Sequence, residues 1–172
     1  MPSRRRAPCS PILQAARTVL EIVFTLATPA DSALLIELEA SAFGDRRWPG
    51  QSIGEAMNAP NTYVLLAHID GDDEATRACA GFLIWHQPTD EVEILSLGTQ
   101  PHWQRRGIAQ KLLAELENQM KIASKSRIIL DVSTLNSPAL ALYRGAGYHE
   151  IGLRKKYYRD TSDAVVMAKA LT

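Results

Sequence analysis

The stretch of this chain with the clearest chemical meaning is Gln104-Arg105-Arg106-Gly107-Ile108-Ala109. It follows an apolar segment typical of a strand, Val92 to Thr99, and it precedes an amphipathic segment typical of a helix. The first turn of a helix leaves backbone N–H groups without partners and carries the positive end of the helix dipole. Gly107 adds no Cβ to block an approaching oxygen. The sequence therefore predicts that a pyrophosphate binds at this junction, and an ordinary turn is the alternative.

A second feature is a carboxylate inside a strand. Asp131 interrupts the apolar run Ile128-Ile129-Leu130-Asp131-Val132-Ser133, which we expect to be covered on both faces of a sheet. An unpaired charge in such a place costs free energy, so its presence favours a chemical role. The alternative is a structural role, in which Asp131 binds a backbone N–H or a lysine at the end of the sheet.

Composition limits the classes of protein to which the chain can belong. The 172 residues are 46% hydrophobic, which suits one domain with a substantial core. Lys plus Arg and Asp plus Glu number 19 each, so net charge favours neither nucleic acid nor a membrane surface as a partner. No apolar run approaches the roughly 20 residues that a membrane span needs. Cys9 and Cys79 are expected to be unpaired, which favours a cytoplasmic setting.

The N-terminal segment is expected to lie outside the folded domain. Its opening, Met1-Pro2-Ser3-Arg4-Arg5-Arg6, resembles the basic start of a signal peptide, but Pro11, Gln14 and Arg17 then break any apolar run of export length. We therefore expect residues 1–19 to form a poorly ordered basic extension and residues 20–172 to form a single domain.

The rest of the chain alternates between strand and helix patterns. Strands are predicted at 20–26, 63–69, 78–86, 91–99, 127–133, 148–157 and 164–170. Helices are predicted at about 28–42, 52–58, 106–123 and 137–144, and an acidic hairpin turn at 70–73. This order predicts an α/β fold with one central mixed sheet of about seven strands flanked by four helices.

Several motifs in these elements resemble those of the GNAT superfamily of N-acetyltransferases. Along the chain they are Leu97-Gly98-Thr99, Gln104 to Ala109, Asn136, Leu142-Tyr143 and Gly147-Tyr148. The later segments Arg154-Lys155-Lys156-Tyr157-Tyr158 and Asp163-Ala164-Val165-Val166-Met167 resemble a narrower group. These are the RimI-type enzymes, which acetylate the N-terminal amine of a ribosomal protein beginning with alanine. The resemblance covers most of residues 20–171 and is strongest from residue 91 onward.

The resemblance implies an acyl-CoA N-acyltransferase fold with acetyl-CoA as co-substrate and no metal. The pantetheine arm would pair with the backbone of Leu97, Gly98 and Thr99. The pyrophosphate would be surrounded by Arg105, Arg106, Gly107, Ile108, Ala109 and Gln110. Asn136 and Tyr143 would complete the acetyl-CoA site.

The resemblance also implies two catalytic residues. Acetyl transfer to an amine requires a base that deprotonates the ammonium group and an acid that protonates the departing thiolate. Tyr143 matches the acid, and its ordinary pKa of about 10 keeps it protonated at neutral pH. Asp131 stands 143 − 131 = 12 positions before it, where the RimI-type pattern has Glu as proton acceptor. Because Asp is one methylene shorter, proton transfer through a water molecule is favoured.

The acceptor is expected to bind between two loops. Phe43 and Trp48 would form one wall of a groove. Tyr157 and Tyr158, predicted to face opposite sides of a strand, would form the other, with one hydroxyl binding the peptide backbone. The predicted function is acetylation of the N-terminal α-amine of a protein, with a ribosomal protein as one possible partner. The alternatives are acetylation of a small amine, such as a polyamine, an amino acid or an aminoglycoside, and a catalytically weak acyl-CoA-binding module.

Other chemistries find no support in the sequence. The four histidines, His68, His86, His102 and His149, have no neighbouring ligands at metal spacing. Gly145-Ala146-Gly147 lacks the third glycine of a dinucleotide fingerprint. The chain contains no Gly-x-Ser-x-Gly motif and no phosphate loop ending in Gly-Lys-Ser/Thr. The sequence leaves the oligomeric state open.

Overall fold

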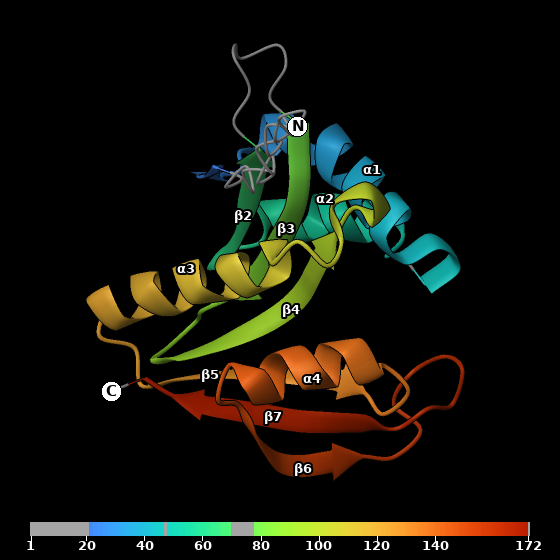
Figure 1. The fold of residues 1–172 in the computed structure, drawn as a ribbon, viewed down its shortest axis with the longest axis vertical. Helices are drawn as coiled ribbons and strands as arrows, with labels where there is room; N and C mark the ends of the chain where they lie inside the picture. The colour runs from blue at the N-terminus through green and yellow to red at the C-terminus, as the bar shows by residue number, and fades with distance from the viewer. Residues whose placement is uncertain (1–20, 47, 70–77, 172) are drawn as a thin grey trace, which may run out of the picture.

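The computed structural model describes residues 21–46, 48–69 and 78–171. The predicted basic extension and the predicted hairpin turn at 70–73 lie outside the described residues. Within the described part, seven strands form one mixed sheet in the order β1-β2-β3-β4-β5-β7-β6 (Figure 1). The predicted fold class is therefore confirmed.

The elements begin and end close to the predicted residues. The strands are β1 (Ile22–Leu26), β2 (Thr62–Ile69), β3 (Ala78–His86), β4 (Glu91–Thr99), β5 (Arg127–Ser133), β6 (His149–Arg154) and β7 (Ala164–Ala170). The helices are α1 (Ser32–Phe43), α2 (Gly50–Asn58), α3 (Ile108–Ile122) and α4 (Ser137–Gly145). None of the helices in the described ranges is long and apolar enough to span a membrane.

One boundary prediction is wrong. The strand expected to reach Tyr157 ends at Arg154, and Lys156 takes a left-handed backbone conformation with a φ of 50°. This conformation turns the chain out of the sheet, so Tyr157 and Tyr158 lie in the loop between β6 and β7.

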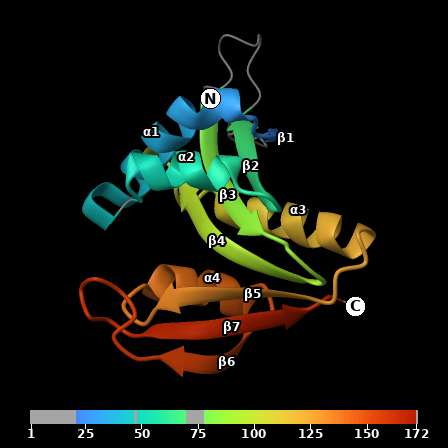
Figure 2. The ribbon, with the colours of Figure 1, turned by 180° about the vertical axis from the view of Figure 1, so that it is seen from behind.

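Helices cover both faces of the first half of the sheet. The α3 helix lies on one face of β2, β3 and β4, and α4 lies on the same side of β5 and β7 (Figure 1). The other face of β2–β4 is covered by α1 and α2 (Figure 2). In α3 the helical spacing of Ile108, Leu112 and Leu116 places all three in the core, where each is at most 1% exposed.

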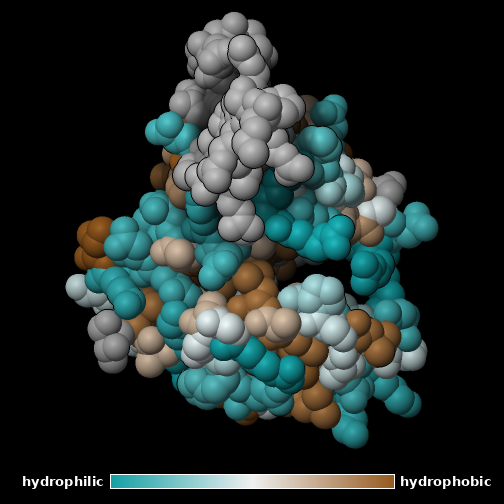
Figure 3. Space-filling model, viewed as in Figure 1, coloured by the Kyte–Doolittle hydropathy of each residue, from teal (hydrophilic) through white to brown (hydrophobic). Residues whose placement is uncertain are grey.

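The sheet is divided at its centre by an irregularity in β4. Ile84 of β3 pairs with Ser96, but the next residue, Trp85, pairs with Ile94, so Leu95 is the extra residue of a β-bulge. The parallel pairing of β4 with β5 runs only from Glu91 to Ile94, and beyond it the two strands diverge (Figure 1). A bulge bends its strand and increases the local twist, which explains the divergence. Figure 3 shows the surface hollowed between the two halves.

Gly98, in the diverging end of β4, has no room for a side chain. An added Cβ would lie 2.5 Å from Cε1 of Phe82 and 3.1 Å from Cβ of Ala42. Gly98→Ala should therefore destabilise the protein by about 1–3 kcal/mol. The matched control is Gly54→Ala in α2, where an added Cβ meets nothing within 4 Å and helix propensity should add about 0.5–1 kcal/mol of stability. Urea unfolding measures both variants, and a Gly98→Ala protein as stable as the parent would contradict this packing.

Candidate active site

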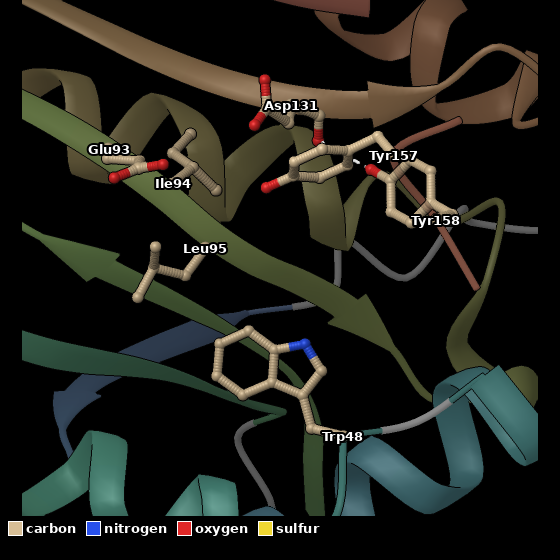
Figure 4. Close-up of a pocket in the computed structure, with 7 residues that line it drawn as sticks. All are labelled: Trp48, Glu93, Ile94, Leu95, Asp131, Tyr157 and Tyr158. Atoms are coloured by element: carbon tan, nitrogen blue, oxygen red, sulfur yellow. Dashed lines mark hydrogen bonds between the residues drawn. The ribbon is translucent and has the colours of Figure 1, made fainter. Parts of the chain in front are cut away.

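A pocket of about 180 Å³ lies where β4 and β5 begin to diverge. It is lined by Trp48, Glu93, Ile94, Leu95, Asp131, Tyr157 and Tyr158 (Figure 4). Its floor comes from the two strands, and its walls come from the α1–α2 loop and the β6–β7 loop. The structure thus brings together Trp48, Asp131 and both tyrosines, which the sequence had indicated as site residues.

Asp131 lies on the face of β5 that points away from α4. Along this strand Ile128, Leu130 and Val132 are buried in the core, whereas the Asp131 side chain is 12% exposed. The expectation that both faces of the strand are covered is therefore wrong. One face packs against the helix layer, and the other borders the pocket. A carboxylate is tolerated here because it faces the pocket rather than the apolar core.

The Asp131 carboxylate has a cationic neighbour in Arg154 of β6. Nε of Arg154 lies 3.3 Å from Oδ1 of Asp131, close enough for an ion pair. Within the described ranges Oδ1 of Asp131 accepts no hydrogen bond, so the Nε–H of Arg154 does not point at this oxygen. The Arg154 side chain is half exposed and also lies over the ring of Tyr157, 5.4 Å from its centre. The exposure of the guanidinium weakens this ion pair, and Oδ1 keeps its capacity to accept a hydrogen bond from a bound group.

Tyr157 and Tyr158 line the pocket together, so the prediction that they face opposite sides of a strand is wrong. Their rings are perpendicular, with centroids 5.2 Å apart. The Tyr158 hydroxyl donates a hydrogen bond of 3.4 Å to the backbone oxygen of Asp131, and burial raises the pKa of this phenol to about 12. The Tyr157 side chain is half exposed and its hydroxyl points into the pocket (Figure 4). One phenol is therefore fixed to the sheet. The other points into the pocket, where burial and the neighbouring Asp131 carboxylate raise the pKa of the Tyr157 phenol.

Tyr143 lies on α4, on the other side of β5 from Asp131. It is 7% exposed and packs edge-on against Tyr148, with ring centroids 5.7 Å apart. Burial raises the pKa of the Tyr143 phenol, and the nearby phenol of Tyr158 raises it further. The phenol stays protonated at neutral pH, as an acid requires.

Phe43, predicted to share a wall with Trp48, is not one of the residues that line the pocket. Its ring packs edge-on against Phe82 at 6.3 Å between centroids, within the core beneath α1 and α2. The structure thus brings only Trp48 of this pair to the pocket.

The residues predicted to bind acetyl-CoA follow the diverging end of β4. Leu97, Gly98 and Thr99 lie beyond the last residue of β4 that pairs with β5. The buried Oγ1 of Thr99 has no hydrogen-bond partner in the described part of the chain, so it is available as a donor or acceptor for the predicted ligand. The Thr99 carbonyl accepts a 3.3 Å hydrogen bond from Nε2 of Gln104, which ties the following loop to the strand.

That loop leads into the start of α3, where the pyrophosphate is predicted to bind. Gly107 is the N-cap residue of α3 and has a φ of 81°, and Arg105 is also left-handed, with a φ of 58°. Nothing lies within 4 Å of the position a Gly107 Cβ would occupy, so the helix start is open. Arg106 stacks over the ring of Trp103 at 5.0 Å. Ala109 and Gln110 follow in the first turn of α3, where backbone N–H groups have no partner inside the helix.

Asn136, also predicted to contact acetyl-CoA, caps α4. Its Oδ1 accepts a 3.2 Å hydrogen bond from the backbone N–H of Ala139. Such a cap fixes the start of the helix that carries Tyr143. The predicted contact with acetyl-CoA remains a prediction beside this structural role.

Glu93 is a pocket residue that the sequence analysis missed. It lies opposite Ile129 in the parallel pairing of β4 with β5, so Glu93 and Asp131 face the pocket from neighbouring strands (Figure 4). The signal was present in Glu91-Val92-Glu93-Ile94, where a polar face alternates with an apolar one as it does around Asp131. No group of three or more His, Cys, Asp and Glu side chains in the described part could hold a metal ion.

Comparison with known proteins relates these features to a family. The sequence profile of the acetyltransferase (GNAT) family matches residues 32–148. The N-alpha-acetyltransferase RimI of Mycobacterium tuberculosis is 35% identical over 145 residues, which cover 83% of this chain and 88% of that protein. The [ribosomal protein bS18]-alanine N-acetyltransferase of Escherichia coli is 32% identical over 92 residues, which cover 52% of this chain and 62% of that protein.

Solved structures share the fold. The ribosomal-protein-S18-alanine N-acetyltransferase from Escherichia coli matches with a TM-score of 0.78 and 21% identity, over 88% of this chain and 95% of that chain. Arabidopsis thaliana NAA60 in complex with acetyl-CoA matches with a TM-score of 0.76 and 18% identity, over 88% of this chain and 99% of that chain.

The predicted pyrophosphate site can be tested at Gly107 with two substitutions of nearly equal shape. Asp and Asn both tolerate a left-handed backbone better than most residues, but only Asp brings a negative charge to the helix start. Gly107→Asp should abolish detectable acetyl-CoA binding, and Gly107→Asn should weaken it much less. Isothermal titration calorimetry measures both affinities. An unchanged dissociation constant for Gly107→Asp would show that the phosphate lies elsewhere.

Proposed function

Because this chain belongs to the acetyltransferase (GNAT) family, we propose that it transfers the acetyl group of acetyl-CoA to the N-terminal α-amine of a protein. The observation that carries the proposal is the pocket between the α1–α2 and β6–β7 loops, which ends at two carboxylates. A chain end can enter such a pocket with its ammonium group foremost. The names of the relatives from Mycobacterium tuberculosis and Escherichia coli support a protein N-terminus as the acceptor. A ribosomal protein that begins with alanine is a candidate partner.

The carboxylates of Glu93 and Asp131 supply the basic side of the reaction. Two negative groups beside one pocket attract an ammonium ion and accept its proton, directly or through a water molecule. Asp131 is one methylene shorter than the Glu of the RimI-type pattern, and the longer Glu93 offers a second proton acceptor on the adjacent strand. The alternative of a catalytically weak binding module rested only on the shorter side chain of Asp131. A second carboxylate at Glu93 makes that alternative less favoured.

Tyr143 supplies the acidic side. Once the neutral amine attacks the thioester carbonyl, the departing thiolate of CoA needs a proton, and the Tyr143 phenol remains protonated because burial raises its pKa. Tyr143 and Asp131 lie on opposite sides of β5. This arrangement suits a reaction in which acetyl-CoA and the acceptor amine approach each other from opposite faces of the sheet.

The function is tested by incubating the protein with acetyl-CoA and a peptide library varied at its first residues. Peptides that begin with a small residue such as Ala or Ser should be acetylated on the α-amine. Lysine side chains should be poor acceptors, because the longer side chain moves the peptide backbone away from the Tyr157 hydroxyl. Mass spectrometry with fragmentation locates the acetyl group. A polyamine panel is run in parallel, and turnover of polyamines without any α-amine product would replace the proposal with the small-amine alternative.

The shared role of the carboxylates is tested with Glu93→Gln and Asp131→Asn, singly and together. Each single variant should lose about tenfold in kcat/KM for the acceptor, and the double variant about 100-fold or more, as expected for loss of a general base. The losses should be greatest at low pH, where more of the amine is protonated. The matched control is Glu91→Gln on the same strand, since Glu91 pairs with Arg127 rather than lining the pocket. Parent-like pH profiles for the double variant would exclude both residues as bases.

A further inference from the structure

Glu39 of α1 is a buried carboxylate that the proposed chemistry does not use. Its side chain is 0% exposed, and the neighbouring helix positions Leu35 and Leu38 are also buried, in the core between α1 and the sheet. Burying a carboxylate costs free energy unless its oxygens are hydrogen-bonded. The partners of Glu39 therefore indicate why the group is kept.

The two oxygens of Glu39 bind two different elements, and both adjoin the pocket. Oε1 accepts a 2.8 Å hydrogen bond from the hydroxyl of Ser96, which directly follows the bulge residue Leu95. Oε2 accepts a 3.3 Å hydrogen bond from the backbone N–H of Trp48 in the α1–α2 loop. Leu95 and Trp48 both line the pocket. Glu39 is thus a bridge between the floor of the pocket at β4 and one of its walls.

Packing alone does not explain a carboxylate at this position. A leucine would fill a similar volume and would avoid the desolvation of a carboxylate. Burial raises the pKa of the Glu39 carboxyl, while the hydrogen bonds from Ser96 and Trp48 oppose the rise. What a leucine could not do is hold the Trp48 backbone against the bulge.

We propose that Glu39 is a positioning residue, which fixes Trp48 against the bulged end of β4 and thereby sets the width of the acceptor pocket. The inference rests on the proposed function, because it takes the pocket lined by Trp48 as the acceptor site. Glu39 makes its two hydrogen bonds with Ser96 and Trp48, neither of which is a predicted catalytic or acetyl-CoA residue. It should therefore govern the KM for the acceptor, and leave kcat and the affinity for acetyl-CoA almost unchanged.

Two substitutions separate this role from a purely structural one. Glu39→Leu removes both hydrogen bonds but fills the core. Glu39→Gln can keep both, because its amide oxygen can accept from Trp48 while its NH₂ group donates to the Ser96 hydroxyl. Glu39→Leu should raise the acceptor KM about tenfold or more, as expected for losing hydrogen bonds to a charged group. Glu39→Gln should restore most of the loss. The melting temperature of Glu39→Leu should stay within about 5 °C of the parent value, because no longer burying a carboxylate offsets the loss of its two hydrogen bonds.

The same variants give a readout that needs no acceptor. Hydrogen exchange of the Trp48 amide should be faster in Glu39→Leu than in the parent and near the parent rate in Glu39→Gln, while amides of α3 exchange as in the parent. If the parent acetylated only small amines, the proposed function would fail, and this exchange measurement would still decide whether Glu39 holds the loop.

Parent-like acceptor KM and parent-like Trp48 exchange in Glu39→Leu would overturn the proposal. So would a parallel loss of acetyl-CoA affinity, because it would indicate general damage to the site. If Glu39→Leu does not fold, Ser96→Ala carries the test, since it removes only the bond to Oε1. It should raise the acceptor KM about threefold. No change in KM and in Trp48 exchange for Ser96→Ala would equally overturn the proposal.

Discussion

The divergence of β4 from β5 is the feature on which the rest of the site depends. Parallel strands that stay paired present no backbone groups to a ligand. Here the extra residue Leu95 ends the pairing after Ile94, so the last residues of β4 are left for another partner. The same bulge carries Leu95 to the pocket and brings Ser96 to the carboxylate of Glu39. One inserted residue therefore shapes both the predicted acetyl-CoA strand and the floor of the acceptor pocket.

The charges around the opening between β4 and β5 differ between the proposed acceptor side and the predicted acetyl-CoA side. The acceptor side carries Glu93 and Asp131, with the half-exposed Arg154 near the second of them. The predicted acetyl-CoA side carries the start of α3, where the helix dipole and free N–H groups would favour a pyrophosphate. In the proposed reaction a cationic amine and an anionic cofactor would thus be attracted to different faces of the same sheet. Tyr143, on α4 on the other side of β5 from Asp131, carries a phenol whose pKa is raised by burial, so it adds no charge to either site.

The sequence predicted most of the fold because local signals were strong. The bounds of β3, β4, β5 and β7 match the predicted ranges, since apolar and β-branched runs there end at turn residues. The wrong predictions concern features that depend on tertiary structure, which the alternation of polar and apolar residues does not encode. The covering of β5 on only one face depends on where β4 leaves it, and the end of β6 depends on the left-handed Lys156. Glu93 and Arg154 became site residues only when the sheet order placed β4 and β6 on either side of Asp131.

The burial of Glu39 is a further feature that the sequence could not predict. At sequence level a glutamate in an amphipathic helix is assigned to solvent, and nothing in the residues around it marks it as buried. Its burial follows from a tertiary contact, because the hydroxyl of Ser96 is 57 positions away and reaches it only after the bulge has turned that strand. An apolar side chain in this place would avoid burying a charge, but it would leave the Ser96 hydroxyl and the Trp48 N–H without this acceptor. The carboxylate makes sense if the position of Trp48 matters more than the free energy lost by burying a charge, and such exchanges of stability for geometry are expected beside a binding site.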